Sequence, residues 1–398
     1  MSRRLEIGAL VALCFFLPLY EAPKNIFWAL YLVVWIVNCA RARDFGGRWD
    51  LWDSLIAAWI ASGFVVAAFA GEPGGDEWRG PLDLLRYGSI LWLTKRSRYS
   101  RRELAWIFGA LVASTIVGLA MAYVAQWRGQ GGGLQLNSVG HVNHTAIYLA
   151  IMLGVCISWV LAAWRHASLG GRALAIAVNA LILVGLVTTA SRGAIGVGLA
   201  LPVLLAIGWW KRSRVPLLAS AVVLAVTAIA MFVGGAEVLR KQERSFETNN
   251  MLAYRAEIWS MATTAWREHP WFGVGMDNFG RVTPYRKRLE EGKAAPTRDP
   301  TRALEFAHAH SLFFNTLAER GVVGSVALWA LFIALFVSLL RNRPVASADD
   351  EAWLLWGAAA TAWLVTVGVG LVNTTLHHEH GILASLLLGL WLSRRPGR

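Results

Sequence analysis

Apolar segments of membrane-spanning length recur along almost the whole chain, and no other feature limits its fold as strongly. A helix needs about 20 mainly apolar residues to cross about 30 Å of hydrocarbon. By this measure the sequence contains about twelve spans, of which the first, fourth and last are short. They lie near 5–20, 25–40, 51–70, 82–94, 104–125, 143–164, 173–189, 194–210, 215–233, 321–340, 352–372 and 380–393. Only 16% of the residues are charged, against about a quarter in soluble domains. We therefore exclude a soluble globule and expect an all-α polytopic membrane protein.

The basic residues indicate how the helices are oriented. The formal net charge of +13 could suggest a nucleic-acid partner, but the basic residues form short clusters between the apolar segments. Every second connection is rich in arginine, and the connections between them are poor in it. The positive-inside rule then places the arginine-rich connections and both termini in the cytoplasm. The arginine-rich clusters are Arg3–Arg4, Arg41–Arg48, Lys95–Arg102, Arg165–Arg172, Lys211–Arg214, Arg341–Arg343 and Arg394–Arg398.

One outer connection, residues 234–307, is far longer than the others. It exceeds the roughly 60 residues beyond which loop charge stops influencing topology. Its many aromatic residues argue against disorder. We predict three parts: about nine N-terminal transmembrane helices in 1–233, a large periplasmic loop domain in 234–307, and about three C-terminal transmembrane helices in 308–398.

Arg192 is the first candidate functional residue, because it lies in a tight outer turn between two apolar helices. Its guanidinium must lie near the outer membrane interface. It could anchor a helix end by snorkelling. Alternatively, a planar cation beside Ser191 and helix N-terminal amides could bind phosphate or pyrophosphate.

Two further groups of candidates lie in the long outer loop and where the chain re-enters the membrane. Arg255, which follows Tyr254, should share a helix face with Trp259 four residues later. His308 and His310 can face one site only if a helix begins after them, and Ser311 is a plausible N-cap for that helix. A histidine at this height titrates near neutrality, as a general base requires. A helix from Ser311 to Leu340 would be longer than the bilayer core is thick, so it should stand above the hydrocarbon or bend at Gly321 or Gly324.

The run His377-His-Glu-His380 resembles a metal cluster. Adjacent ligands in so short a run rarely surround one ion with good geometry. The three cysteines, Cys14, Cys39 and Cys156, lie far apart in apolar segments and look like small buried side chains. The sequence therefore predicts no metal site and no cofactor.

Three stretches together resemble the bacterial O-antigen ligase family, within the O-antigen ligase and polymerase superfamily. Residues 309–324 (AHSLFFNTLAERGVVG) are similar to its His-(Asn/Ser)-x-x-Leu…Glu-x-Gly-x-x-Gly signature. The stretches 190–194 (ASRGA) and 254–259 (YRAEIW), the latter leading into 269–275 (HPWFGVG), also match the family pattern. Ser311 stands where the family often has asparagine, which leaves the hydrogen-bond partner of His310 open.

The resemblance implies transfer of a polysaccharide from undecaprenyl pyrophosphate to lipid A–core oligosaccharide at the periplasmic face of the bacterial inner membrane. It implies that His310 is the catalytic base and that Arg192 and Arg255 hold the donor pyrophosphate, with inversion and without metal. The residues expected to support them are His308, Ser191, Ser311, Asn315 and Tyr254.

Two relatives within the superfamily, an O-antigen polymerase and a protein O-oligosaccharyltransferase, are alternatives that the motifs do not separate securely. A single long outer loop favours a ligase. An anion transporter is a less favoured alternative, because it should carry charges near the membrane midplane and two matched halves.

Overall fold

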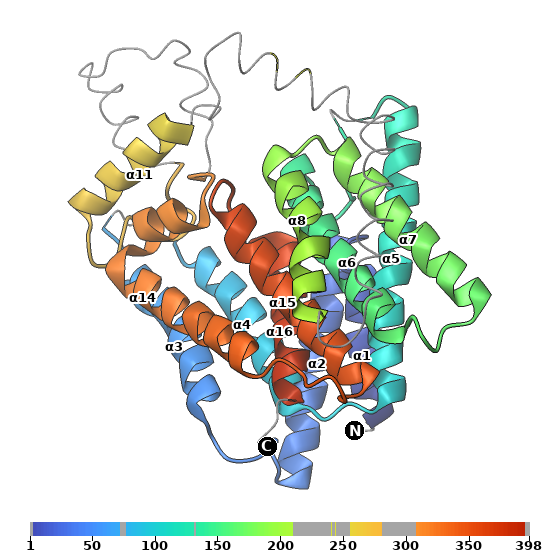
Figure 1. Ribbon diagram of the computed structural model, residues 1–398. Coiled ribbons are helices and arrows are strands. Elements are labelled where there is room, and N and C mark those ends of the chain that lie inside the picture. The colour runs from blue at the N-terminus through green and yellow to red at the C-terminus, as the bar shows by residue number, and fades with distance from the viewer. Residues whose placement is uncertain are drawn as a thin grey trace.

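The computed structural model describes residues 3–71, 77–130, 133–209, 240, 243, 255–280 and 308–394. These residues form helices and no strand, so the predicted all-α fold is confirmed (Figure 1). The helices are α1 (Arg3–Phe16), α2 (Glu21–Ala42), α3 (Leu51–Ala68), α4 (Arg79–Arg96), α5 (Arg101–Trp127), α6 (Val142–Ala163), α7 (Leu169–Thr188), α8 (Arg192–Trp209), α11 (Arg255–Glu268), α14 (Leu312–Arg341), α15 (Asp350–Gly370) and α16 (His378–Ser393).

Within the described residues, 8 helices are long and apolar enough to cross a membrane: α2, α3, α5, α6, α7, α8, α14 and α15. The predicted spans near the start and end of the chain correspond to α1 and α16, which have 14 and 16 residues. The predicted span at 215–233 lies outside the described residues. The chain is a multi-pass membrane protein, and the count of about twelve spans stays a prediction.

Helix α6 lies at the centre of the bundle. In its most apolar stretch of 18 residues, 89% of the residues are buried, which is more than in any other candidate span of the described residues. In a membrane protein a helix that is apolar all round can face either lipid or protein, and α6 is covered by protein. Helices α15, α7, α8 and α16 pack against it. Gly154 of α6 has no side chain, which lets Thr361 of α15 approach closely.

Charged contacts lie at both ends of the helix bundle. At the end where both described termini lie, here called the terminal end, Arg3 and Arg394 donate to the carbonyl oxygens of Arg98 and Tyr99. Buried Asp53 of α3 accepts from Lys95 and Arg96 at this same end. The predicted arginine-rich clusters of residues 3–4, 95–102 and 394 therefore meet at one end, as one set of connections should.

The opposite end, here called the loop end, carries α11 (Figure 1). Here Lys24, just inside the start of α2, forms an ion pair with Glu379 of α16, and Ser138 donates to the same carboxylate. The lysine and the glutamate are both almost fully buried. Removal of either partner would leave an uncompensated buried charge. The first and last predicted outer connections are thus fastened to each other.

Helix α14 has 30 residues and is interrupted at Gly321, whose φ of 57° and ψ of −157° are not helical. The expected bend is confirmed at this glycine. Positive φ is accessible to glycine without a side-chain clash. The short segment of α14 before Gly321 lies beside α11 at the loop end (Figure 1).

Candidate functional site

His310 lies in the turn that precedes α14. Its φ is 46°, a left-handed conformation that side chains other than glycine rarely adopt. Neighbouring bonds hold the turn: Asn315 Oδ1 accepts from the Ala309 N–H at 2.9 Å. Ser311 is the N-cap residue of α14, as expected, but its hydroxyl donates to the Gly370 carbonyl oxygen at 3.3 Å. Asn315 and Ser311 therefore fix the position of the imidazole.

Arg192 is the first residue of α8, directly after buried Ser191. The turn is tight because Ala190 has a positive φ of 52°. The Ser191 carbonyl oxygen accepts from the Ile195 N–H at 2.9 Å and begins the helix. At Gly193 an added Cβ would lie 2.8 Å from Val372 Cγ2. The start of α8 therefore packs against the loop between α15 and α16.

The same loop holds the other two candidates. Arg255, the first described residue of α11, donates from Nε to the Val372 carbonyl oxygen at 2.8 Å. The next residue, Asn373, is hydrogen-bonded to the side chain of His310. Three residues remote in sequence, Arg192, Arg255 and His310, thus meet around Val372 and Asn373. Tyr254 lies outside the described residues.

The charges in this cluster act on one another. Burial lowers the pKa of Arg255, and the positive charge of Arg192 lowers it further. The pKa of His310 is also below its ordinary value, first because of burial and then because of the Arg255 charge, while the Asn373 hydrogen bond raises it. A neutral imidazole beside Arg255, with Arg192 close enough to act on Arg255 in turn, suits a ligand that carries several negative charges.

Helix α11, which carries Arg255, is anchored to α14. The Trp259 indole stacks on the Phe314 ring with centroids 5.1 Å apart. Ile258, Ala262 and Ala265 are buried in a small separate core with Val274, Phe279, Ala309 and Ala318. Arg255 and Trp259 do share a helix face, since both point toward elements of the site.

The segment after α11 lies against the bend in α14, and backbone hydrogen bonds join the two. The N–H groups of Val274 and Gly275 donate to the carbonyl oxygens of Ala318 and Glu319, at 2.9 and 3.0 Å. In return, those of Val322 and Val323 donate to Pro270 and Trp271, at 2.9 and 3.1 Å. These bonds satisfy groups that the interrupted helix would leave unpaired. The glycines Gly273 and Gly321 are therefore needed for backbone contact between the 269–275 segment and α14.

His308 lies beside a cluster of histidines. Its ring centroid lies 4.7 Å from that of His377. Burial, with smaller contributions from His310 and His378, lowers the pKa of His308 to about 4. His308 and Asn315 also line a small cavity of about 60 Å³. His308 is therefore neutral at neutral pH.

Sequence reasoning did not select Val372 and Asn373. They follow an apolar helix directly and carry no charge, so no motif marks them. It also did not select His144 of α6, although His141 and His144 are spaced so that both can face one side of a helix start.

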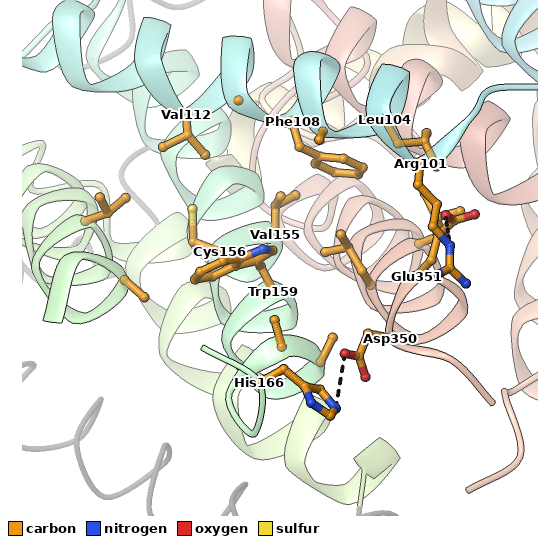
Figure 2. A pocket seen from close by; sticks show the side chains of 18 of the residues that line it. Arg101, Leu104, Phe108, Val112, Val155, Cys156, Trp159, His166, Asp350 and Glu351 are labelled. Atoms are coloured by element: carbon orange, nitrogen blue, oxygen red, sulfur yellow. Dashed lines mark ion pairs between the residues drawn. The ribbon is translucent and has the colours of Figure 1, made fainter. Parts of the chain in front are cut away.

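A larger groove of about 770 Å³ lies between α5, α6, α7 and α15 (Figure 2). Apolar side chains such as Phe108, Val155 and Trp159 line it. Its polar rim is at the terminal end, where His166 faces Asp350 at 3.8 Å. No candidate residue lies in this groove, so it is separate from the site.

Fold and site together define a multi-pass helical membrane protein with a histidine and two arginines gathered at one end of its helix bundle. Residues 177–329, which contain all three, match the family model described as O-Antigen ligase. An O-antigen ligase of Pseudomonas aeruginosa is 26% identical over 174 residues, which cover 43% of this chain and 39% of that protein. Both comparisons support the O-antigen ligase family, as the sequence motifs predict.

Proposed function

We propose that the protein is an O-antigen ligase of lipopolysaccharide biosynthesis. It would transfer a polysaccharide from undecaprenyl pyrophosphate to lipid A–core oligosaccharide, at the periplasmic face of the bacterial inner membrane. The observation that supports this most is the meeting of His310, Arg192 and Arg255 around Val372 and Asn373. The family match covers the same three residues.

In this proposal His310 is the general base. Its neutral imidazole takes the proton from an acceptor hydroxyl, whose oxygen attacks the anomeric carbon of the donor. The bond from that carbon to the pyrophosphate oxygen breaks, and its electron pair leaves with the pyrophosphate. Attack from the opposite face inverts the anomeric configuration. The low pKa of His310 keeps the base form available.

Arg192 and Arg255 bind the donor pyrophosphate and stabilise the negative charge that grows as it leaves. Arg255 is held at the site because its Nε donates to the Val372 carbonyl oxygen. Charge stabilisation of this kind, in a poorly hydrated site, commonly contributes roughly 2.7–4 kcal/mol per donor. The mechanism uses no metal ion.

An O-antigen polymerase or a protein O-oligosaccharyltransferase would use the same three side chains on a different acceptor. The proposal is tested by incubating the purified protein with lipid-linked polysaccharide and either lipid A–core or further donor. A ligase lengthens lipid A–core, whereas growth of the donor alone would identify a polymerase.

Replacement of the base provides the matching mutational test. We expect His310→Ala to lose transfer by at least a hundredfold, as general bases contribute about 10²–10⁴-fold. His166→Ala, at the exposed terminal end, is the control and should keep full activity. Product is measured by gel shift of the lipid A–core band. Substantial transfer by the His310→Ala protein, at normal expression, would remove His310 from the mechanism.

A further inference from the structure

A second group of side chains at the loop end remains unexplained by glycan transfer. His144, His377 and His378 each offer a ring nitrogen, and these three atoms lie within 4.8 Å of one another. They come from two helices: His144 from the first turn of α6, and His377 and His378 from the start of α16. We infer that this triad, here called the histidine triad, binds a transition-metal ion such as Zn²⁺.

Buried nitrogens without a hydrogen-bond partner point to a missing ligand. Among the described residues, Nδ1 of His144 and Nδ1 of His377 are buried and have no partner. A buried polar atom without a partner is rare and calls for an explanation such as a bound ion or water. The rings are already close: the His144 centroid lies 5.5 Å from that of His377 and 4.8 Å from that of His378.

The donor set indicates which metals fit. Neutral imidazole nitrogen is a preferred ligand for Zn²⁺, Cu²⁺ and Ni²⁺, whereas Mg²⁺ and Ca²⁺ prefer oxygen. Tetrahedral Zn²⁺ with bonds of about 2.0–2.1 Å places two ligand nitrogens about 3.3 Å apart. Small ring rotations would close the present spacing. His378 is exposed, so an ion can reach the triad from solvent, and water can complete its coordination.

The acidic residue within the run is not one of the three grouped ligands. Glu379 is fully buried and accepts from Lys24 and Ser138. The carboxylates of Glu379, Asp83 and Glu21 lie near enough to His378 to act on its charge, and the Lys24 charge acts in the opposite direction. The carboxylates would partly balance an ion.

Two helix dipoles also oppose the binding of a cation at the triad. The N-termini of α6 and α16 both meet here, and the positive ends of their dipoles repel any cation. That repulsion also disfavours protonation of the imidazoles and leaves their lone pairs free. Coordinate bonds to three imidazoles are much stronger than repulsion from a helix end.

A bound ion would fasten the start of α6 to the turn before α16. That turn follows Val372 and Asn373, which contact Arg255 and His310. The strained backbone of Leu376 and His378, with φ of 54° and 47°, is of the kind that persists only where the surroundings fix it. An ion bound to the triad would therefore stabilise the conformation of this loop and would not contact the reacting atoms. This role replaces the expectation, drawn from residues 377–380 alone, that the run holds no metal.

Direct metal binding tests the inference without using transfer activity. The full-length protein, purified without a polyhistidine tag, is stripped of metal and titrated with Zn²⁺ or with Co²⁺ at neutral pH. We expect about one equivalent of Zn²⁺ per chain and visible Co²⁺ absorption typical of tetrahedral nitrogen ligands. His144→Ala and His377→Ala should each weaken binding at least tenfold, and the matched control His166→Ala should bind as the wild type does. Binding well below one equivalent, or equal binding by all three variants, would overturn the inference.

A measurement on the wild-type protein alone guards against variants that fail to fold. Zn²⁺ should protect His378, the exposed member of the triad, from acylation by diethylpyrocarbonate, as mapped by mass spectrometry, while His166 stays reactive. Because Zn²⁺ binds only the folded state, it should also raise the melting temperature. Equal modification of His378 with and without Zn²⁺ would contradict the proposal. These outcomes do not depend on whether the protein is a ligase.

Discussion

His310 combines a strained backbone with a protected imidazole. A left-handed conformation at a residue other than glycine costs about 1–3 kcal/mol and persists only where neighbouring contacts hold it. Here the Ala309–Asn315 bond, the buried Ser311 and the bond to Asn373 supply those contacts. These contacts hold the imidazole in one direction relative to Arg255. A general base must be oriented in this way before substrate binds.

At Arg192 and Arg255 the shape of the guanidinium matters as well as its charge. Arg192→Lys and Arg255→Lys should each lose transfer nearly as completely as the alanine variants, about a hundredfold or more, because lysine cannot bind phosphate in a bidentate manner. The measurement is initial rate with saturating acceptor. Full activity of Arg192→Lys would indicate an arginine that only anchors its helix by snorkelling.

The proposed base also predicts a pH dependence. Burial and the neighbouring charges of Arg255 and His141 favour the neutral imidazole, so its pKa is lowered. The base form is lost only when the pH falls below the ordinary histidine range. We expect transfer to stay constant from alkaline pH through neutrality and to decline only in more acidic buffer.

Asn373 gives this pH dependence a specific test. Its hydrogen bond raises the pKa of His310. Asn373→Ala should therefore move the acidic decline to still lower pH and reduce the rate at neutral pH about tenfold, through loss of positioning. An unchanged pH profile with a reduced rate would indicate a purely structural role for Asn373.

The sequence indicated the candidate reactive side chains more readily than the groups that position them. Histidine and arginine at an apolar membrane edge are conspicuous because burial cannot explain them. Val372 acts through its backbone carbonyl oxygen, a group that every residue carries. No residue pattern could have selected it.

Among the helices, α14 and α11 depend on each other. The 30 residues of α14 make it longer than a bilayer core, which predicts a bend but not its partner. The partner is the 269–275 segment, whose backbone replaces the hydrogen bonds that the bend removes. The sequence showed both glycine motifs, yet their contact could be seen only in three dimensions.

Glycine substitutions at this crossing test the contact. At Gly321 an added Cβ would lie 2.5 Å from the Trp271 carbonyl group, and φ is positive. Gly321→Ala should lower the melting temperature by several degrees and reduce transfer strongly. Gly196→Ala in α8, where a Cβ meets open space, is the matched control and should be neutral or slightly stabilising. Equal melting temperatures of the two variants would show that the crossing tolerates a side chain.

At the scale of the whole molecule, the side of the membrane predicted for the basic clusters agrees with the contacts that they make. Clusters predicted to share one side of the membrane, such as Arg3, Arg101 and Arg394, contact partners at the terminal end. The number of spans was harder to predict, because α1, α4 and α16 are short or carry charge. Length and hydropathy alone do not decide whether such helices cross.

The orientation of the bundle can be tested by labelling. In a variant with Cys14, Cys39 and Cys156 replaced by alanine, a single cysteine is introduced as Arg128→Cys or His166→Cys. Both positions are exposed, at the loop end and the terminal end respectively. A membrane-impermeant maleimide applied to cells with a permeabilised outer membrane should label Arg128→Cys only. Labelling of His166→Cys alone would reverse the proposed topology.

The place of Val372 and Asn373 along the polypeptide has a consequence for biogenesis. They follow Arg192, Arg255 and His310 in the order of translation, so the ribosome delivers all three before the pair that gathers them. The Lys24–Glu379 ion pair likewise forms only after α16 has been synthesised. A partly inserted chain therefore lacks the assembled site, and under the proposed function transfer begins only after the whole chain has been inserted.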